Sequence, residues 1–355
     1  MNQHHVNGIP PAFERRCRAL PAPRRLRFSP GFVRGLLAAA LLPGAGCSLT
    51  DVAIAEPDDL IVAEVQVVLT LAADNRNVSL AAWALLHRTY LFGEAPSLAG
   101  AVVKVSADSR RVVRLEEQDS LSSCVGENPF LRDDEESEPS PGAVCYRAEA
   151  ARSPFVPGER LSLEIATPDG RVLTGSSRIP GAFFFTGLNH ERGRCRMEPD
   201  TNYRFRWTAA KDAWAYVADA RFEGLAKAFA ARNIESPDTL YLGGLSIRGG
   251  RSIVFPGNFG LFDFLSADEV EREVIRELRN GLPEGSRATV SIAATDRNWV
   301  NWARGGNFNP SGLLRIPSVF GDGTGVFATA PRRLVRVKSS VAGAGEPPLC
   351  GPPEP

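Results

Sequence analysis

Few side chains in this 355-residue chain have the types and spacing that catalysis requires. Only two of the four histidines, His87 and His190, lie outside the first few residues. The chain contains no His-Glu-x-x-His and no Gly-x-Ser-x-Gly pattern, and no cysteine stands beside a plausible base. The usual signatures of metalloproteases, esterases and thiol enzymes are therefore missing. We predict no catalytic residue and no cofactor.

Acidic residues leave one enzymatic alternative open. Two carboxylates that hydrolyse a glycosidic bond need only meet in space, so a single sequence does not decide against a secreted hydrolase acting on glycans. The acidic run from Asp133 to Glu138 offers the oxygen ligands that Ca²⁺ prefers, but it matches no EF-hand loop. We expect it to form a solvated loop. The segment Gly321–Gly325 lacks the lysine of a phosphate loop and predicts a tight turn. We predict no metal site.

Trp299 and Trp302 are the residues best suited to bind a ligand without chemistry. They stand three positions apart and are flanked by Asn298 and Asn301. Together they could form an exposed platform that stacks on a sugar or peptide ring. Aromatic residues at this helical spacing also pack into protein cores, and the sequence leaves both interpretations open.

The first 46 residues have the organisation of a secretory signal. Seven arginines precede a short apolar run from Gly35 to Leu42, and small residues then lead to Cys47. The run is too short to span a bilayer, which takes roughly 20 apolar residues. Small residues followed directly by a cysteine resemble the bacterial lipobox, although Gly44 stands where that motif usually has leucine. We expect cleavage before Cys47 and lipidation of its sulfur; an ordinary signal peptide with a free Cys47 thiol is the alternative.

The cysteines of the mature chain fit an exported protein. Cys124, Cys145, Cys195 and Cys350 are an even number, and four cysteines allow three disulfide pairings. We predict that Cys124 pairs with Cys145, closing a loop of about 20 residues, and that Cys195 pairs with Cys350, holding the tail to the second domain. A zinc site is the alternative, but no Cys-x-x-Cys pair exists.

Apolar and polar residues alternate over several short segments. From Leu60 to Leu71, valines and leucines fall on one face and Glu64, Gln66 and Thr70 on the other, which is typical of a half-buried strand. Further strands are expected at 83–92, 101–107, 111–118, 144–148, 160–167 and 171–178. About seven short strands joined by turns predict an immunoglobulin-like β-sandwich over residues 59–180.

A second β-rich domain is expected over residues 181–340. Strands are predicted at 203–207, 213–222, 287–295 and 332–338, and the first two resemble the start of a fibronectin-type sandwich. One or two short helices interrupt it, at 223–231 and near 266–280, where Ser266 and Glu269 suit a capping box. The predicted fold class is therefore mainly β, with two tandem β-sandwich domains. A lipidated linker at 47–58 precedes them and a Pro/Gly-rich tail at 341–355 follows.

Five short stretches stand in one order along the mature chain: Val67–Leu71, Gly100–Val103, Pro157–Leu163, Asn298–Trp302 and Ile316–Phe327. Together they resemble the domain-of-unknown-function 4249 family of bacterial lipoproteins, over about Leu60 to Lys338. The last stretch departs from the family's usual form, which has an asparagine before the isoleucine and a double glycine. The resemblance implies a lipid-anchored, β-rich outer-membrane or periplasmic protein, often found beside TonB-dependent transporters, with no known catalytic residue.

The charge distribution excludes one class of partner. The leader holds seven arginines and one acid, so the mature chain has about six more acidic than basic residues, whereas nucleic-acid binding needs a concentrated basic surface. We expect a non-enzymatic lipoprotein of the cell envelope that binds a ligand or a TonB-dependent transporter. By resemblance to enterobacterial sorting rules, Ser48 after the cysteine implies the outer membrane, facing the periplasm or the surface. Besides the hydrolase, an adhesion or structural surface module remains the alternative.

Overall fold

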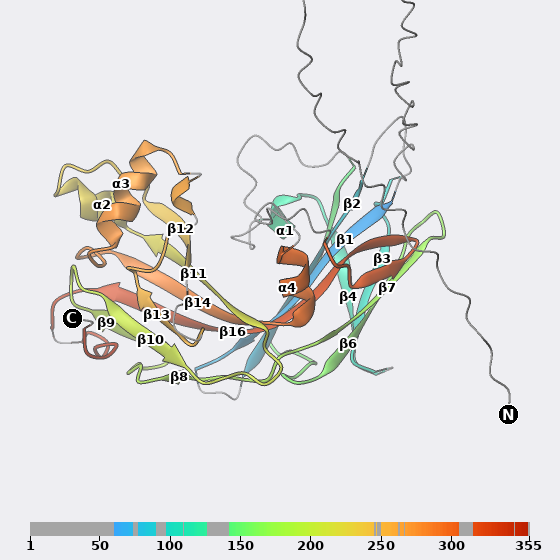
Figure 1. Cartoon of the computed structure of the whole chain (residues 1–355), viewed down its shortest axis with the longest axis horizontal. Helices are drawn as coiled ribbons and strands as arrows, with labels where there is room; N and C mark the ends of the chain where they lie inside the picture. Colours follow the sequence, from blue (N-terminus) through green and yellow to red (C-terminus); the bar gives the residue numbers. More distant parts are fainter. Residues whose placement is uncertain are drawn as a thin grey trace, which may run out of the picture. The chain divides into compact units, whose positions relative to one another are not determined.

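The computed structural model describes residues 60–353, except 74–76, 90–96, 109, 126–141, 245, 247–249, 262, 266, 305–314 and 344. The predicted signal peptide, Cys47, the linker and the acidic run lie outside the described residues. Strands make up most of the described structure (Figure 1). None of the helices in this part of the chain has the length and apolar character needed to cross a membrane.

Nine strands close into a barrel. They follow the order β1-β2-β5-β4-β3-β6-β7-β15-β16, and β16 pairs with β1 to complete the ring. The strands are β1 (Ile61–Leu71), β2 (Val78–Arg88), β3 (Val102–Ser106), β4 (Val112–Gln118), β5 (Val144–Ala150), β6 (Arg160–Ala166), β7 (Val172–Arg178), β15 (Val319–Gly321) and β16 (Gly323–Ser339). Strand β1 thus has hydrogen-bonded neighbours on both edges, β2 on one and β16 on the other.

The prediction of two tandem β-sandwich domains is wrong. The segment 59–180, expected to form an immunoglobulin-like sandwich, supplies seven strands of the closed barrel, and β15 and β16 from the far end of the chain complete it. Alternation with a period of two is the same in both architectures, because each strand turns one face to the core in either case. The sequence pattern therefore identified strands but did not distinguish an open edge from a closed one.

Side chains fill the barrel. Ile61, Val65 and Leu69 alternate along the inner face of β1 and are completely buried, and they share one core with Phe155 and Phe327. Full burial of each such side chain contributes about 1.5–3 kcal/mol relative to exposure. The barrel interior is thus the main apolar core of this half of the molecule.

Strand β16 continues beyond the barrel. Residues 323–332 pair in parallel with β1, whereas residues 332–338 pair antiparallel with β14 (Arg287–Thr295). The sheet extends from β14 through β11 (Ala215–Glu223) to β12 (Thr239–Gly244), and β9 (Arg194–Met197) pairs with the end of β16. Figure 1 shows β16 as the strand that is common to the barrel and to this extension.

A smaller sheet, ordered β13-β10-β8, shares a core with the extension. Its strands are β8 (Phe185–Thr186), β10 (Tyr203–Trp207) and β13 (Ser252–Phe255). Phe255 stacks on Phe205 of its own sheet and on Phe222 of β11, so aromatic rings join the two sheets. Buried side chains of α2 (Leu225–Ala230) and α3 (Glu269–Leu278) complete this core. The remaining helices are α1 (Ser122–Val125), η1 (Asp263–Leu265) and α4 (Arg297–Arg304).

The predicted helix near 266–280 corresponds to α3, but it begins later than expected. Asp268 is its N-cap, with the carboxylate accepting a hydrogen bond of 2.8 Å from the backbone N–H of Glu271. Aspartate caps helices as well as serine does, so the choice between the two positions was open from the sequence. Ser266 lies outside the described residues.

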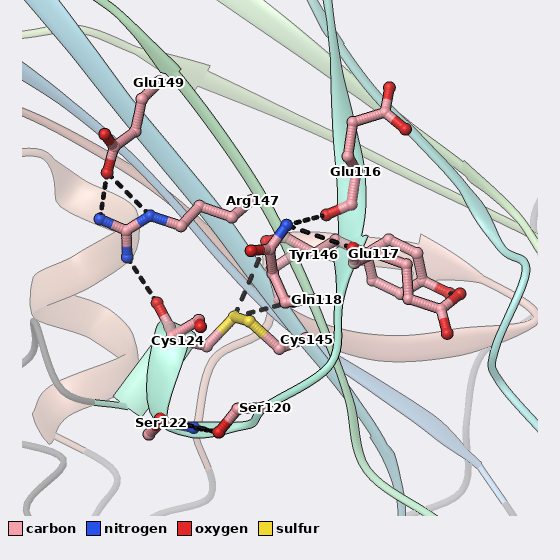
Figure 2. The surroundings of a disulfide bond; sticks show 12 residues. Glu116, Glu117, Gln118, Ser120, Ser122, Cys124, Cys145, Tyr146, Arg147 and Glu149 are labelled. Atoms are coloured by element: carbon pink, nitrogen blue, oxygen red, sulfur yellow. Dashed lines mark hydrogen bonds and ion pairs between the residues drawn. A yellow bond between two sulfur atoms is a disulfide. The ribbon is translucent and has the colours of Figure 1, made fainter.

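Both predicted disulfide pairings, Cys124–Cys145 and Cys195–Cys350, are confirmed. The first fastens α1 to the outer face of β5 (Figure 2). Both cysteines are buried in a small cluster with Trp83. Figure 2 also shows Arg147 of β5, which donates a hydrogen bond of 2.5 Å to the carbonyl oxygen of Ser123. The second disulfide joins β9 to the C-terminal tail.

We expect the two disulfides to differ in how much they stabilise the fold. They close loops with sequence separations of 21 and 155 residues. Loop entropy then predicts that alanine at Cys124 and Cys145 lowers the free energy of unfolding by about 3 kcal/mol, and alanine at Cys195 and Cys350 by about 5 kcal/mol. Urea unfolding followed by tryptophan fluorescence would measure both. Equal losses would contradict the loop-entropy explanation.

Candidate ligand-binding site

A half-open pocket of about 60 Å³ lies on one face of the continuous sheet formed by β11, β14, β16, β1 and β2. Its floor consists of short side chains that the strand register places next to one another: Ala293 beside Val217, and Ala330 beside Val68. Ala328 adds to the same floor. Because these side chains are small, the sheet is hollowed at this point.

Two tryptophans stand at the pocket. Trp83 of β2 is 4% exposed and belongs to the cluster around the Cys124–Cys145 disulfide, so most of its ring is already packed. Trp299, on the first turn of α4, is half-buried and keeps part of its surface open to the pocket. Trp299 is therefore the aromatic side chain that a ligand can reach.

Asp296 and Asn298 hold the start of α4 against β16. Among the described strands, none pairs with this edge of β16 between Gly325, which faces β15, and Arg332, which faces β14. In this interval the backbone N–H of Thr329 donates to Asp296 Oδ2 (3.3 Å), and the Asp296 N–H donates to the Thr329 carbonyl oxygen (3.3 Å). Side chains of the α4 turn thus take the place of a neighbouring strand.

The amide of Asn298 makes the matching contacts. Its Nδ2 donates to the carbonyl oxygen of Phe327 on β16 (2.8 Å) and to that of Ser176 on β7 (2.9 Å). Asp296 Oδ1 also accepts the backbone N–H of Trp299 (2.9 Å), which makes it the N-cap of α4. The position of Trp299 is consequently fixed by hydrogen bonds to two barrel strands.

Asp296 is an unusual carboxyl because it is only 4% exposed. Burial raises its pKa to about 6, and hydrogen bonds from Ser177 and from the backbone N–H groups of Trp299 and Thr329 lower the pKa against this effect. The Ser177 hydroxyl also contacts Thr329 Oγ1 (2.8 Å). These contacts tie β7, β16 and α4 together at one buried point.

The polar end of the pocket is formed by Asp219, Ser291 and Arg332, on three neighbouring strands. Asp219 of β11 and Ser291 of β14 are register partners. Burial raises the pKa of Asp219 to about 6, whereas the nearby Arg332 and Ser291 lower it. Arg332 Nε donates to Thr70 Oγ1 (2.9 Å). Ser291 is 3% exposed, and its hydroxyl lies beside the Asp219 carboxyl, whose pKa it lowers.

The structure gives the two tryptophans of the predicted platform different surroundings. Trp299 lines the pocket, but Trp302, one turn later on α4, is not among the pocket residues. The guanidinium of Arg315 lies 4.9 Å from the centroid of the Trp302 ring, and Arg315 also forms an ion pair with Glu64 at 3.5 Å. The pocket therefore contains one of the two predicted aromatic residues.

Sequence reasoning did not identify Asp219, Ser291 or Arg332. The one signal was an acid between the inward-facing Ala218 and Ala220 of a predicted strand, which marks Asp219 as outward-facing. An outward acid on a strand is normally solvated. Only pairing between strands that are far apart in the sequence brings Ser291 and Arg332 beside it.

The acids near the pocket bear on the alternative of a hydrolase. Asp219 is the only carboxylic side chain among the described residues that line it, whereas glycoside hydrolysis usually takes two carboxylates about 5 to 9.5 Å apart. His190 lies elsewhere, in a second cavity of about 150 Å³ beside Arg333. In the described part of the chain, no three His, Cys, Asp or Glu side chains are grouped as a metal site would require.

No protein-family model matches the chain, and no curated protein matches it. Among solved structures, it is similar to the two tandem V-type regions of VCBP3, a v-region-containing chitin binding protein, at 9% sequence identity. The similarity covers 79% of this chain and 99% of that chain, with a TM-score of 0.16. A similarity with so low a TM-score supports no argument about fold or ligand.

The raised pKa of Asp296 predicts that the stability of the fold depends on pH. The folded pKa of Asp296, about 6, exceeds the ordinary value of 3.8, so the folded state holds a proton that the unfolded state releases between these values. The resulting stability is present at low pH and is lost as the pH rises through 6. From pH 5 to pH 7.5, the free energy of unfolding should fall by about 1 kcal/mol through this group.

Urea unfolding at the two pH values would test this with Asp296→Asn, in which the pH dependence should shrink by that amount. The exposed Asp238→Asn is the matched control and should behave as the unchanged protein does. An Asp296→Asn protein that keeps the full pH dependence would show that Asp296 is not the group responsible.

Proposed function

We propose that this protein is an exported, non-catalytic binding protein, anchored to a membrane of the cell envelope by a lipid on Cys47. The observation that carries the proposal is the pair of disulfides, one in the barrel half and one in the extension. Such bonds persist in oxidising compartments and are rare in the cytosol. They agree with the arginine-rich leader and the cysteine that follows its small residues.

The pocket supports binding over the alternative functions. A hydrolase with two acting carboxylates would need a second acid near Asp219, and the described lining holds none. An adhesion or structural module would present a surface without a groove, whereas this sheet face is hollowed and carries polar side chains at one end. Concave sites with an apolar floor and a few polar groups are the usual form of small-ligand sites.

The proposed cellular location and the proposed partner of this protein rest on the sequence alone. The resemblance to the domain-of-unknown-function 4249 family favours the outer membrane and a TonB-dependent transporter as partner. Residues 47–58 would act as a tether that lets the folded body stand off the membrane. Its ligand would then be handed to, or received from, a membrane protein within reach of that tether.

Fractionation of the native host tests the anchor. Cys47→Ala should move the protein from the membrane pellet to the soluble fraction and abolish incorporation of labelled palmitate, because the acylated sulfur is gone. Cys17→Ala, in the discarded leader, is the matched control and should leave both unchanged. A Cys47→Ala protein that stays in the pellet with its label would refute anchoring at this residue.

Mild crosslinking of intact envelopes tests the partner. We expect a high-mass species that contains a TonB-dependent transporter, and we expect Cys47→Ala to reduce it at least tenfold, because the untethered protein is no longer held near the membrane. Mass spectrometry of the excised species would identify the partner. Recovery of the free monomer alone would count against a transporter.

A further inference from the structure

We propose that the pocket binds a single neutral pyranose ring of a glycan, with the ring face against Trp299 and the ring hydroxyls at Asp219, Ser291 and Arg332. This inference rests on the proposed function, since it names the ligand class of the binding site described there. Three features carry it: the shape of the pocket, its hydrogen-bonding groups and its charge.

The shape suits one ring. Ala293, Ala328 and Ala330 line the floor with side chains that end at Cβ, and Trp299 lines the same pocket. A pyranose has an apolar C–H face and polar edges, so it can lie against an indole while its edges remain hydrogen-bonded. The enclosed space of about 60 Å³ is smaller than a whole hexopyranose, so one ring would lie partly in the half-open site and the rest of a glycan would stay in solvent.

The hydrogen-bonding groups match hydroxyls. A hydroxyl both donates and accepts, and the pocket offers Asp219 as an acceptor and Arg332 as a donor. Ser291 can do either, and its buried Oγ lies beside the Asp219 carboxyl.

The charge favours a neutral ligand. Asp219 and Arg332 are the only charged side chains among the described lining residues, and their charges are opposite. Gln66 and Thr295 add neutral polar groups. A uronic acid would bring a second negative charge near Asp219 and an ammonium group a second positive charge near Arg332, so a ring without charge fits best.

Calorimetric titration of the mature chain in detergent would test the inference. The probes are the methyl glycosides of glucose, galactose, mannose and N-acetylglucosamine, with L-leucine as a zwitterionic probe of similar size. We expect saturable binding of at least one glycoside and quenching of tryptophan fluorescence. Trp299→Ala and Asp219→Asn should each weaken binding at least tenfold.

Two further variants keep the test independent of folding defects. Ala293→Leu fills the half-buried floor without removing a polar group and should abolish glycoside binding while thermal unfolding changes little. Trp214→Ala is the matched control: Trp214 is 53% exposed and lies outside the pocket lining, so its loss should change affinity less than twofold.

Each outcome is decisive. Glycoside binding that Trp299→Ala and Ala293→Leu leave unchanged would overturn the assignment of the site. Binding of L-leucine but of no glycoside, with the same sensitivity to Trp299→Ala, would overturn the ligand class while preserving the pocket. Absence of binding by all probes would overturn the inference as well. The anchoring at Cys47 is decided separately by membrane fractionation, so failure of one proposal is distinguishable from failure of the other.

Discussion

The fold depends on how the backbone groups of β16 find hydrogen-bond partners in the interval between its two neighbouring strands, β15 and β14. This one strand belongs to the barrel in its first half and to the extension in its second, and the strands beside it change from β15 to β14. In the interval, Asp296 and Asn298 bond to the backbone of Thr329 and Phe327. Pro331, which follows, has no N–H to satisfy. An unpaired buried backbone group is costly. The hydrogen bonds from the first turn of α4 are therefore required to stabilise this part of β16.

Barrel closure imposes a second constraint, at the start of β16. A Cβ on Gly325 would lie 2.0 Å from the carbonyl oxygen of Ala63, and one on Gly323 would lie 2.4 Å from that of Ile61. Gly325 also has a φ of +142°, which other residues rarely adopt. Only glycine allows β1 and β16 to approach here, which accounts for Gly323 and Gly325 in this segment.

The candidate site follows from these two constraints. Because β16 links the halves, β1 and β2 of the barrel and β11 and β14 of the extension form one surface, and their small side chains leave it hollow. Because Asp296 caps α4, Trp299 is held where it lines that hollow. Burial also raises the pKa values of Asp219 and Asp296 to about 6, so the two carboxyls nearest this region are the ones most strongly desolvated.

The sequence by itself determined the local features: most strand positions through their period of two, and helix α3 through its apolar stripe. Its four cysteines allowed three pairings, and the structure confirmed the predicted one. The sequence also pointed to Trp299. Only the tertiary structure decided that the sheet closes, that β16 begins at Gly323 rather than at Arg332, and that Asp219, Ser291 and Arg332 meet. The physical reason is that pairing between distant strands produces no periodic pattern in the sequence. In addition, glycine and proline have low strand propensity, so the first half of β16 does not resemble a strand in the sequence.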